Sequence, residues 1–254
     1  MAEEEPVETG PAYAVPLVED VVFPLREEIL TAAYEGTTTA EAKFRAGLEK
    51  DAAKAAEEEG GDGLAVPEKN LTFGEISFKN LFDLLNLCKS KTEIYPAETV
   101  VVDCGSGLGK QVIGAALLDS WLKVCGVELL ESYDTMAQAA LEKFKAGVET
   151  MDESVPRCAD VALQKGNFVD EVAGLCGENA AIVCALSPVF QADQLTALCT
   201  ALQGLKMGSL LITMTRAAPD VEYWNPICVQ KMECPWGTAT VFIHSKFKMP
   251  PVEE

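Results

Sequence analysis

The sequence predicts an α/β fold built on one mixed, seven-stranded sheet, and three observations carry this prediction. Short apolar runs alternate with helix-like segments through the middle of the chain, which is typical of parallel strands joined by crossover helices. One of these runs ends in an acid and enters a turn with glycine at 105, 107 and 109. Near the end of the chain, two strand-like runs flank a short turn. This pattern indicates an antiparallel hairpin.

The first quarter of the chain is acidic and is expected to lie outside the sheet. Residues 1–63 carry 16 acidic and 5 basic side chains, a net charge of −11 out of −20 for the whole chain. Residues 1–16 combine acids with prolines, so we expect a disordered tail. We expect residues 17–70 to form an acidic helical extension and residues 71–249 to form the domain that contains the sheet.

Two helices are expected within the extension. One follows Pro24, where scattered apolar residues begin. The other covers residues 39–59, because this segment is rich in Ala, Glu and Lys, which favour helix. The glycine pair at 60–61 ends it. Its apolar stripe, Phe44 and Leu48, is thin, so we expect loose packing.

A third helix is expected before the sheet, within residues 72–91. Ser77 is suited to the N-cap position because its hydroxyl can accept a hydrogen bond from the first turn. Apolar residues then recur at helical spacing, which predicts one buried face; these are Phe78, Leu81, Phe82, Leu85 and Cys88.

The strand–helix alternation follows. Five parallel strands are expected at residues 99–103, 124–128, 160–165, 180–186 and 209–214. Helices are expected between them at residues 110–119, 132–150 and 193–205. The hairpin strands are expected at 227–233 and 238–246, joined by Cys234-Pro235-Trp236-Gly237.

The turn after the first strand is expected to cradle a nucleotide. Three valines form a buried run that Asp103 ends, and glycine then allows the backbone to approach a ligand closely. A dinucleotide fingerprint beginning at Gly105 would need glycine where Lys110 stands, and no P-loop Gly-Lys-Ser/Thr is present. The spacing Asp-x-Gly-x-Gly-x-Gly instead resembles motif I of class I S-adenosylmethionine (AdoMet) methyltransferases. A glycine-rich turn also follows strands in other α/β proteins.

A second acid supports the nucleotide interpretation. Glu128 closes the second predicted strand, 25 residues after Asp103. A carboxylate near this position binds a ribose diol in nucleotide-binding folds, since its two oxygens can accept from both hydroxyls. The alternative is a solvated acid in a loop. Two acids that end consecutive strands favour the ribose role.

The net charge of −20 restricts the partners. A chain this acidic repels the phosphate backbone of nucleic acids, so no direct DNA binding is expected from it alone. Basic proteins such as histones or ribosomal proteins are its natural electrostatic partners. Solubility alone is the other explanation of the charge.

Cysteine and histidine usage limits the remaining function classes. The nine cysteines form no Cys-x-x-Cys pair, and the chain begins without a signal peptide, so we expect a reducing, intracellular setting and no secretion. The one histidine, His244, argues against a histidine-based zinc site or a histidine-centred triad, and no metal is expected. No apolar run approaches membrane-spanning length, so no membrane partner is expected.

Four segments together resemble a particular family. They are Phe73-Gly74-Glu75-Ile76-Ser77-Phe78, the motif DCGSGLGKQV at 103–112, Gly126-Val127-Glu128, and Gly166-Asn167-Phe168-Val169. In this order and spacing they resemble the Dot family (disruptor of telomeric silencing) of histone methyltransferases, which act on lysine seventy-nine of histone H3. The resemblance covers about residues 71–246 and implies the Rossmann-like sheet of class I methyltransferases, with AdoMet as cofactor.

The resemblance also implies a cofactor site. It assigns cofactor-binding roles to Gly74, Glu75, Asp103, Gly105, Ser106, Gly107, Gly109, Glu128, Asn167 and Phe168. Of these, Glu75 would contact the amino-acid end of AdoMet, residues 103–107 would line its methionine part, and Glu128 would hold the ribose. Asn167 and Phe168 would flank the adenine. Family members usually carry aspartate at the Asn167 position, but an amide oxygen can still accept from the adenine amino group.

The acceptor side of the site departs from the family pattern. Phe73, Phe190 and Trp236 are candidates for an aromatic channel that admits a lysine, and Ser187 lies where the family has an Asn-Asn-Phe element. That element is replaced here by Leu-Ser-Pro, so its substrate-side amide is missing. Lys110 stands where the family usually has glutamine. Ordinary core packing would also account for the aromatic residues.

Three functions remain open from the sequence. The first is a protein-lysine methyltransferase that acts on histone H3 in the nucleus. The second is a related methyltransferase that acts on another basic protein, in the nucleus or cytoplasm. The third is a module that binds AdoMet and has lost methyl transfer.

Overall fold

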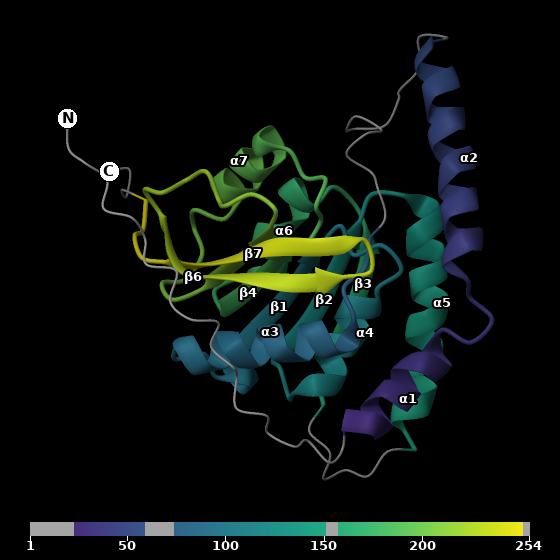
Figure 1. Ribbon diagram of the computed structural model, residues 1–254, viewed down its shortest axis with the longest axis horizontal. Coiled ribbons are helices and arrows are strands. Elements are labelled where there is room, and N and C mark those ends of the chain that lie inside the picture. The colour runs from purple at the N-terminus through teal and green to yellow at the C-terminus, as the bar shows by residue number, and fades with distance from the viewer. Residues whose placement is uncertain (1–22, 59–73, 151–156, 251–254) are drawn as a thin grey trace.

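The computed structural model describes residues 23–58, 74–150 and 157–250. Seven strands form one sheet in the order β3-β2-β1-β4-β5-β7-β6 (Figure 1). The strands are β1 (Thr99–Cys104), β2 (Lys123–Glu128), β3 (Val161–Lys165), β4 (Ala180–Ala185), β5 (Leu210–Met214), β6 (Trp224–Cys234) and β7 (Gly237–Lys246). β1 to β5 are parallel, and β7 pairs antiparallel with both β5 and β6. The predicted architecture of five parallel strands and a terminal hairpin is confirmed.

Seven α-helices are described besides a single 3-10 turn at Pro96–Glu98. They are α1 (Phe23–Ala33), α2 (Thr39–Glu58), α3 (Phe78–Lys91), α4 (Lys110–Leu118), α5 (Glu131–Val148), α6 (Phe168–Cys176) and α7 (Ala192–Ala201). Within the described ranges, no helix is long and apolar enough to cross a bilayer.

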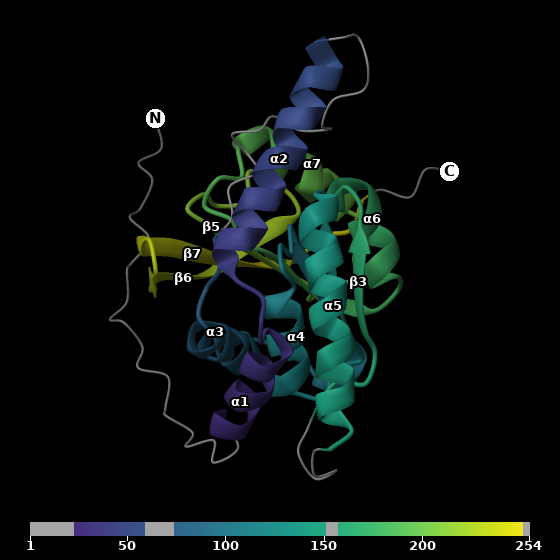
Figure 2. The ribbon, with the colours of Figure 1, turned by 90° about the vertical axis from the view of Figure 1, so that its right-hand side faces the viewer.

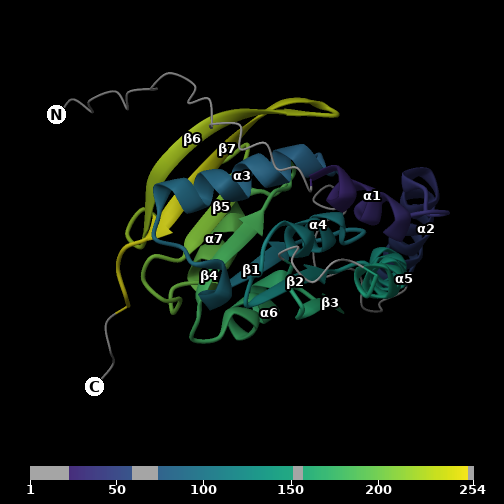
Figure 3. The ribbon, with the colours of Figure 1, turned by 90° about the horizontal axis from the view of Figure 1, so that it is seen from below.

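Helices cover both faces of the sheet. In Figure 1, α6 and α7 lie above the strands and α3 and α4 lie below them, and Figure 3 looks onto the face that α3 and α4 cover. Successive side chains of a strand point to opposite faces. Val101 of β1 therefore packs in one core layer with α3, α4 and α5, whereas Val100 and Val102 pack in the other layer with α6 and α7. Burial on both faces explains why the central strands are continuous apolar runs.

The predicted N-cap of α3 is confirmed. The backbone N–H of Asn80 donates to Ser77 Oγ at 3.1 Å. Lys89 and Lys91 lie in the last turn, where positive charge suits the helix dipole. This helix packs its apolar face on α4 and precedes β1.

No helix is predicted from the sequence between β3 and β4, and this prediction is wrong. Asn167 and Phe168 are given only the cofactor contacts that the resemblance implies. In the structure Asn167 is the N-cap of α6, and its Oδ1 accepts from the N–H of Val169 at 3.1 Å. The helix supplies the crossover that joins two parallel strands in one sheet.

The predicted apolar stripe of α2 is also wrong. Phe44 and Leu48 are 67% and 55% exposed, while Ala42 and Ala46 are buried. Figure 2 shows α2 beside α5, and small side chains permit that close approach. The Glu49 carboxylate accepts from the N–H groups of Glu131 and Ser132 at 2.8 and 2.9 Å, so the extension caps the N-terminus of α5.

Several boundaries differ from the expected ones. α7 ends at Ala201 rather than at 205, and β6 begins at Trp224 rather than at 227. The hairpin turn is shorter than expected because Cys234 and Gly237 pair with each other, which leaves Pro235 and Trp236 between the strands. The expected tail at 1–16 lies outside the described residues.

Candidate functional site

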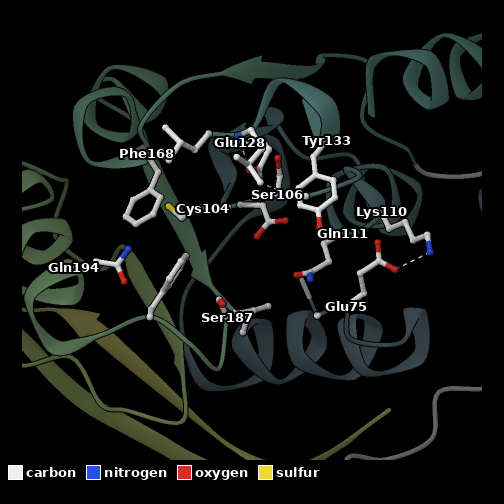
Figure 4. A pocket seen from close by; sticks show the side chains of 18 of the residues that line it. Glu75, Cys104, Ser106, Lys110, Gln111, Glu128, Tyr133, Phe168, Ser187 and Gln194 are labelled. Atoms are coloured by element: carbon white, nitrogen blue, oxygen red, sulfur yellow. Dashed lines mark hydrogen bonds and ion pairs between the residues drawn. The ribbon is translucent and has the colours of Figure 1, made fainter. Parts of the chain in front are cut away.

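A cavity opens at the carboxyl ends of β1, β2 and β4, which is where ligands bind in open α/β sheets. Figure 4 shows the side chains around it. The lining residues come from loops and helix starts that are far apart in sequence: Gly74, Glu75, Asp103, Cys104, Gly105, Ser106, Gly107, Lys110, Gln111, Glu128, Leu129, Leu130, Tyr133, Asn167, Phe168, Leu186, Ser187, Phe190 and Gln194. Eleven of the fourteen site candidates that the sequence analysis names therefore meet around one cavity.

The glycine-rich turn after β1 folds back across the end of β2. The N–H groups of Gly105 and Ser106 donate to the carbonyl of Val127 at 2.9 and 3.0 Å. Gly105 has φ +75°, which residues with a Cβ rarely adopt. A Cβ built on Gly105 would lie 3.1 Å from Cζ of Phe190. This position therefore requires glycine both for the turn and for the space above it.

Glu128 is held in one orientation by the backbone. Its Oε2 accepts from the N–H of Gly107 at 2.8 Å, and its Oε1 accepts from the N–H of Leu130 at 2.9 Å. Burial nevertheless raises the pKa of the carboxyl above its usual value, because the backbone donors offset only part of the desolvation. Each oxygen keeps a further lone pair that could accept from a ligand hydroxyl.

Asp103 is the most perturbed acid of the cavity. Its Oδ2 is buried and has no hydrogen-bond partner among the described residues. Burial, followed by the charges of Glu128 and Glu75, raises the pKa of Asp103 to about 7. A buried carboxyl oxygen without a partner is costly. The cavity therefore favours a ligand that donates a hydrogen bond to Asp103 or carries positive charge.

Glu75 lies at the opposite end of the cavity from Phe168 (Figure 4). Its Oε2 pairs with Nζ of Lys110 at 2.7 Å, while its buried Oε1 has no partner in the described part of the chain. Burial raises the pKa of Glu75, and Lys110 opposes that shift. Lys110 Nζ also lies 5.4 Å from the ring of Tyr34, whose hydroxyl donates to the carbonyl of Leu108 at 2.7 Å. The extension thereby contacts the glycine-rich turn.

The end of the cavity near α6 is aromatic. The ring centroids of Phe168 and Phe190 are 5.1 Å apart with an interplanar angle of 42°. Figure 4 shows Phe168 and Gln194 at this end and Glu128 between it and Glu75. A ligand that suits this arrangement has a flat apolar group at one end, hydroxyls in the middle and positive charge at the other end.

Two of the expected site residues, Gly109 and Trp236, are not among the described residues that line the cavity. A third, Phe73, lies outside the described residues. A Cβ on Gly109 would lie 2.9 Å from Cδ1 of Leu163, so this glycine allows the start of α4 to pack closely. Trp236 is 42% exposed on the hairpin turn, and a Cβ on Gly74 would lie 3.2 Å from its ring. Trp236 therefore covers the Gly74 backbone rather than the cavity.

Three polar lining residues were missed by the sequence analysis. Gln111 and Tyr133 lie in the first turns of α4 and α5, and Gln194 lies in the first turn of α7. A sequence signal for them exists: each lies in the first turn of a helix that follows a parallel strand, and such helices begin at the carboxyl edge of the sheet, where the cavity lies. Gln111 Oε1 is buried without a partner among the described residues.

Replacing Asp103 with asparagine is expected to change the pH dependence of stability in the ligand-free protein. In the unfolded chain this carboxyl ionises near the ordinary aspartate pKa of 3.8, and in the folded protein it ionises at about 7. Its contribution to the free energy of unfolding is therefore present at low pH and lost as pH rises to about 7, a loss on the order of 4 kcal/mol. Urea unfolding from pH 5 to 8 should show Asp103→Asn gaining stability relative to wild type up to about pH 7. A constant difference across this range would contradict the shifted pKa.

Comparisons with known proteins show which family the chain matches and which solved structures it resembles. The family model described as "Histone methylation protein DOT1" matches residues 67–226. The chain is similar to the solved structure of the rRNA methyltransferase aviRa from Streptomyces viridochromogenes, with a TM-score of 0.47 and 13% identity over 71% of this chain and 90% of that one. It is also similar to the tRNA methyltransferase TrmK from B. subtilis, with a TM-score of 0.45 and 15% identity over 70% of this chain and 68% of that one. No curated protein sequence matches it.

Proposed function

Because this chain belongs to the DOT1 family of histone methylation proteins, it is an AdoMet-dependent methyltransferase, and we propose that it methylates a lysine of histone H3. The observation that carries the cofactor assignment is the pair of buried carboxyl oxygens, Asp103 Oδ2 and Glu75 Oε1, that have no partner in the described part of the chain. AdoMet carries an ammonium and a sulfonium, so it brings positive charge to a cavity whose described lining holds three acids, Glu75, Asp103 and Glu128, and one lysine, Lys110.

The lining residues fit the rest of the cofactor as well. Glu75 and Asp103 are proposed to hold its amino-acid end, and Glu128 its ribose hydroxyls. Phe168 is proposed to contact the adenine, in agreement with its place at the aromatic end of the cavity (Figure 4). Asn167 uses its Oδ1 to cap α6, so any bond from that oxygen to the adenine would share it with the cap.

The chemistry is a direct displacement in which bound AdoMet supplies a methyl group on a positively charged sulfur. The protein's part is to align the acceptor amine with that methyl and to exclude water. An acceptor lysine must first lose a proton, and an apolar channel favours this because desolvation lowers the pKa of an amine. Ser187, at the cavity wall, and Trp236, over Gly74, are proposed to border that channel.

The proposed substrate is consistent with the charge of the chain. Histones are basic, and a net charge of −20 attracts a basic protein while it repels DNA phosphates. A histone substrate would place the protein in the nucleus. If electrostatic attraction drives histone binding, the affinity should fall as the salt concentration rises.

The first test of the proposed substrate is a methylation assay. The full chain is incubated with methyl-labelled AdoMet and, in parallel, with nucleosomes, free histones and a fractionated cell extract. Label on a lysine of histone H3 would support the proposal. Label confined to other proteins would overturn the substrate and retain the methyltransferase.

Replacing Glu128 with alanine is expected to weaken AdoMet binding about 10- to 100-fold. The substitution removes one or two charge-assisted hydrogen bonds to the ribose. Isothermal titration calorimetry would measure the dissociation constant, with Glu142→Ala as a control because Glu142 is an exposed acid on α5. An unchanged constant in Glu128→Ala would contradict the ribose assignment.

A further inference from the structure

The wall of the cavity between β4 and α7 is a short loop outside the regular secondary structure. Within Ser187–Phe190, Pro188 and Val189 form a turn, and the carbonyl of Val189 accepts from Nε2 of Gln191 at 2.7 Å. Phe190 is buried, with 6% of its surface exposed. Its ring packs against the Phe168 ring and lies directly over Gly105. Something other than regular secondary structure must hold this ring in place.

Arg216 supplies the bond that reaches the loop from another element. Its Nη1 donates to the carbonyl of Phe190 at 3.1 Å, and its Nη2 lies 3.5 Å from Oε1 of Gln191. The next residue of the chain, Gln191, is joined to α7 because its N–H donates to Oε1 of Gln194 at 3.0 Å. The aromatic wall is thus anchored to α7 on one side and to Arg216 on the other.

An unusual turn at the end of β5 directs Arg216 towards this loop. Thr215 has φ +69°, the one positive φ of a non-glycine residue in the described ranges. This conformation is strained for a β-branched residue. Two short bonds maintain it: the N–H of Thr215 donates to the carbonyl of Thr240 at 2.7 Å, and the N–H of Arg216 donates to that of Met214 at 2.8 Å.

From these contacts we propose that Arg216 is a positioning residue of the cofactor site. By binding the carbonyl of Phe190, it holds the Phe190 ring against Phe168, and so it sets the shape of the surface that receives the flat end of the cofactor. The strained turn at Thr215 keeps the guanidinium in place. This inference rests on the cofactor site proposed above, and it assigns a role to two residues outside the cavity lining.

The test compares Arg216→Ala with two other variants. Lys206→Ala removes the same charge from an exposed position outside the loop, and Arg216→Lys restores a donor. Two quantities are measured: hydrogen exchange of the Val189, Phe190 and Gln191 amides without cofactor, and the dissociation constant of AdoMet by calorimetry. Thermal unfolding checks that all variants fold.

Arg216→Ala is expected to exchange faster in this loop and to bind AdoMet about 5- to 10-fold more weakly, the effect of one lost hydrogen bond. Arg216→Lys should recover part of both losses, while Lys206→Ala should match wild type within about twofold in dissociation constant. The proposal is overturned if Arg216→Ala matches Lys206→Ala, or if only one of the two quantities changes. Failure of wild type to bind AdoMet would instead overturn the cofactor site, and the exchange data would still show whether Arg216 holds the loop.

Discussion

Replacing Gly105 with arginine is expected to abolish AdoMet binding, with a loss in affinity of more than about 100-fold. The position has φ +75°, and even a Cβ would lie 3.1 Å from the Phe190 ring. A longer side chain must either enter the cavity or displace the aromatic wall. Both results remove the space in which the cofactor is proposed to lie. Calorimetric titration with AdoMet measures the loss.

Gly208→Arg is the matched control for this experiment. Gly208 also has a positive φ, +84°, but a Cβ there would meet nothing within 4 Å. Both variants should therefore lose about 1 to 2 kcal/mol of stability from the left-handed backbone. Only Gly105→Arg should lose the ligand. Equal AdoMet affinity in the two variants would show that the cavity is not the cofactor site.

Replacing Gly126 with alanine is expected to destabilise the fold by about 3 kcal/mol. Gly126 lies in β2 beneath the glycine-rich turn, and a Cβ there would lie 2.6 Å from Cγ2 of Val112 and 2.7 Å from Cβ of Ser106. Both neighbours are buried, so the added methyl cannot be accommodated by rotating an exposed side chain. Urea unfolding would measure the change in the free energy of unfolding.

Gly174→Ala is the control for overpacking. Gly174 lies inside α6, where a Cβ would meet nothing within 4 Å. Alanine is the better helix former, so this variant should gain up to about 1 kcal/mol. If Gly126→Ala were as stable as wild type, the glycine-rich turn would not approach β2 as closely as described. The described geometry of the cavity floor would then also be wrong.

Most of the sheet could be predicted because its signals are local. The valine run of β1 and the acids near the ends of β1 and β2 are visible in a few consecutive residues. The hairpin was equally visible from two runs and the turn between them. The helix α6 is not predicted, because its start is marked by Asn167 alone, and an asparagine after a strand suits a turn as well as a helix N-cap.

The packing of α2 was mispredicted for a different reason. Hydrophobicity singled out Phe44 and Leu48, but contact with α5 selects for small residues, and Ala42 and Ala46 are buried instead. Periodicity describes which residues share a face of a helix. It does not show which face a neighbouring helix can approach most closely.

The sequence by itself determined the α/β class, the order of the central elements, the family, and most of the residues that surround the cavity. These follow from short-range patterns, since the carboxyl ends of parallel strands always meet at one edge. Only the tertiary structure decided the pKa values, ion pairs and hydrogen bonds of those residues. The pKa of Asp103 near 7, the pairing of Lys110 with Glu75 and the bond from Arg216 to Phe190 depend on burial and on distances between segments far apart in the chain. Desolvation and Coulomb interactions act through space, so no local pattern of residues encodes them.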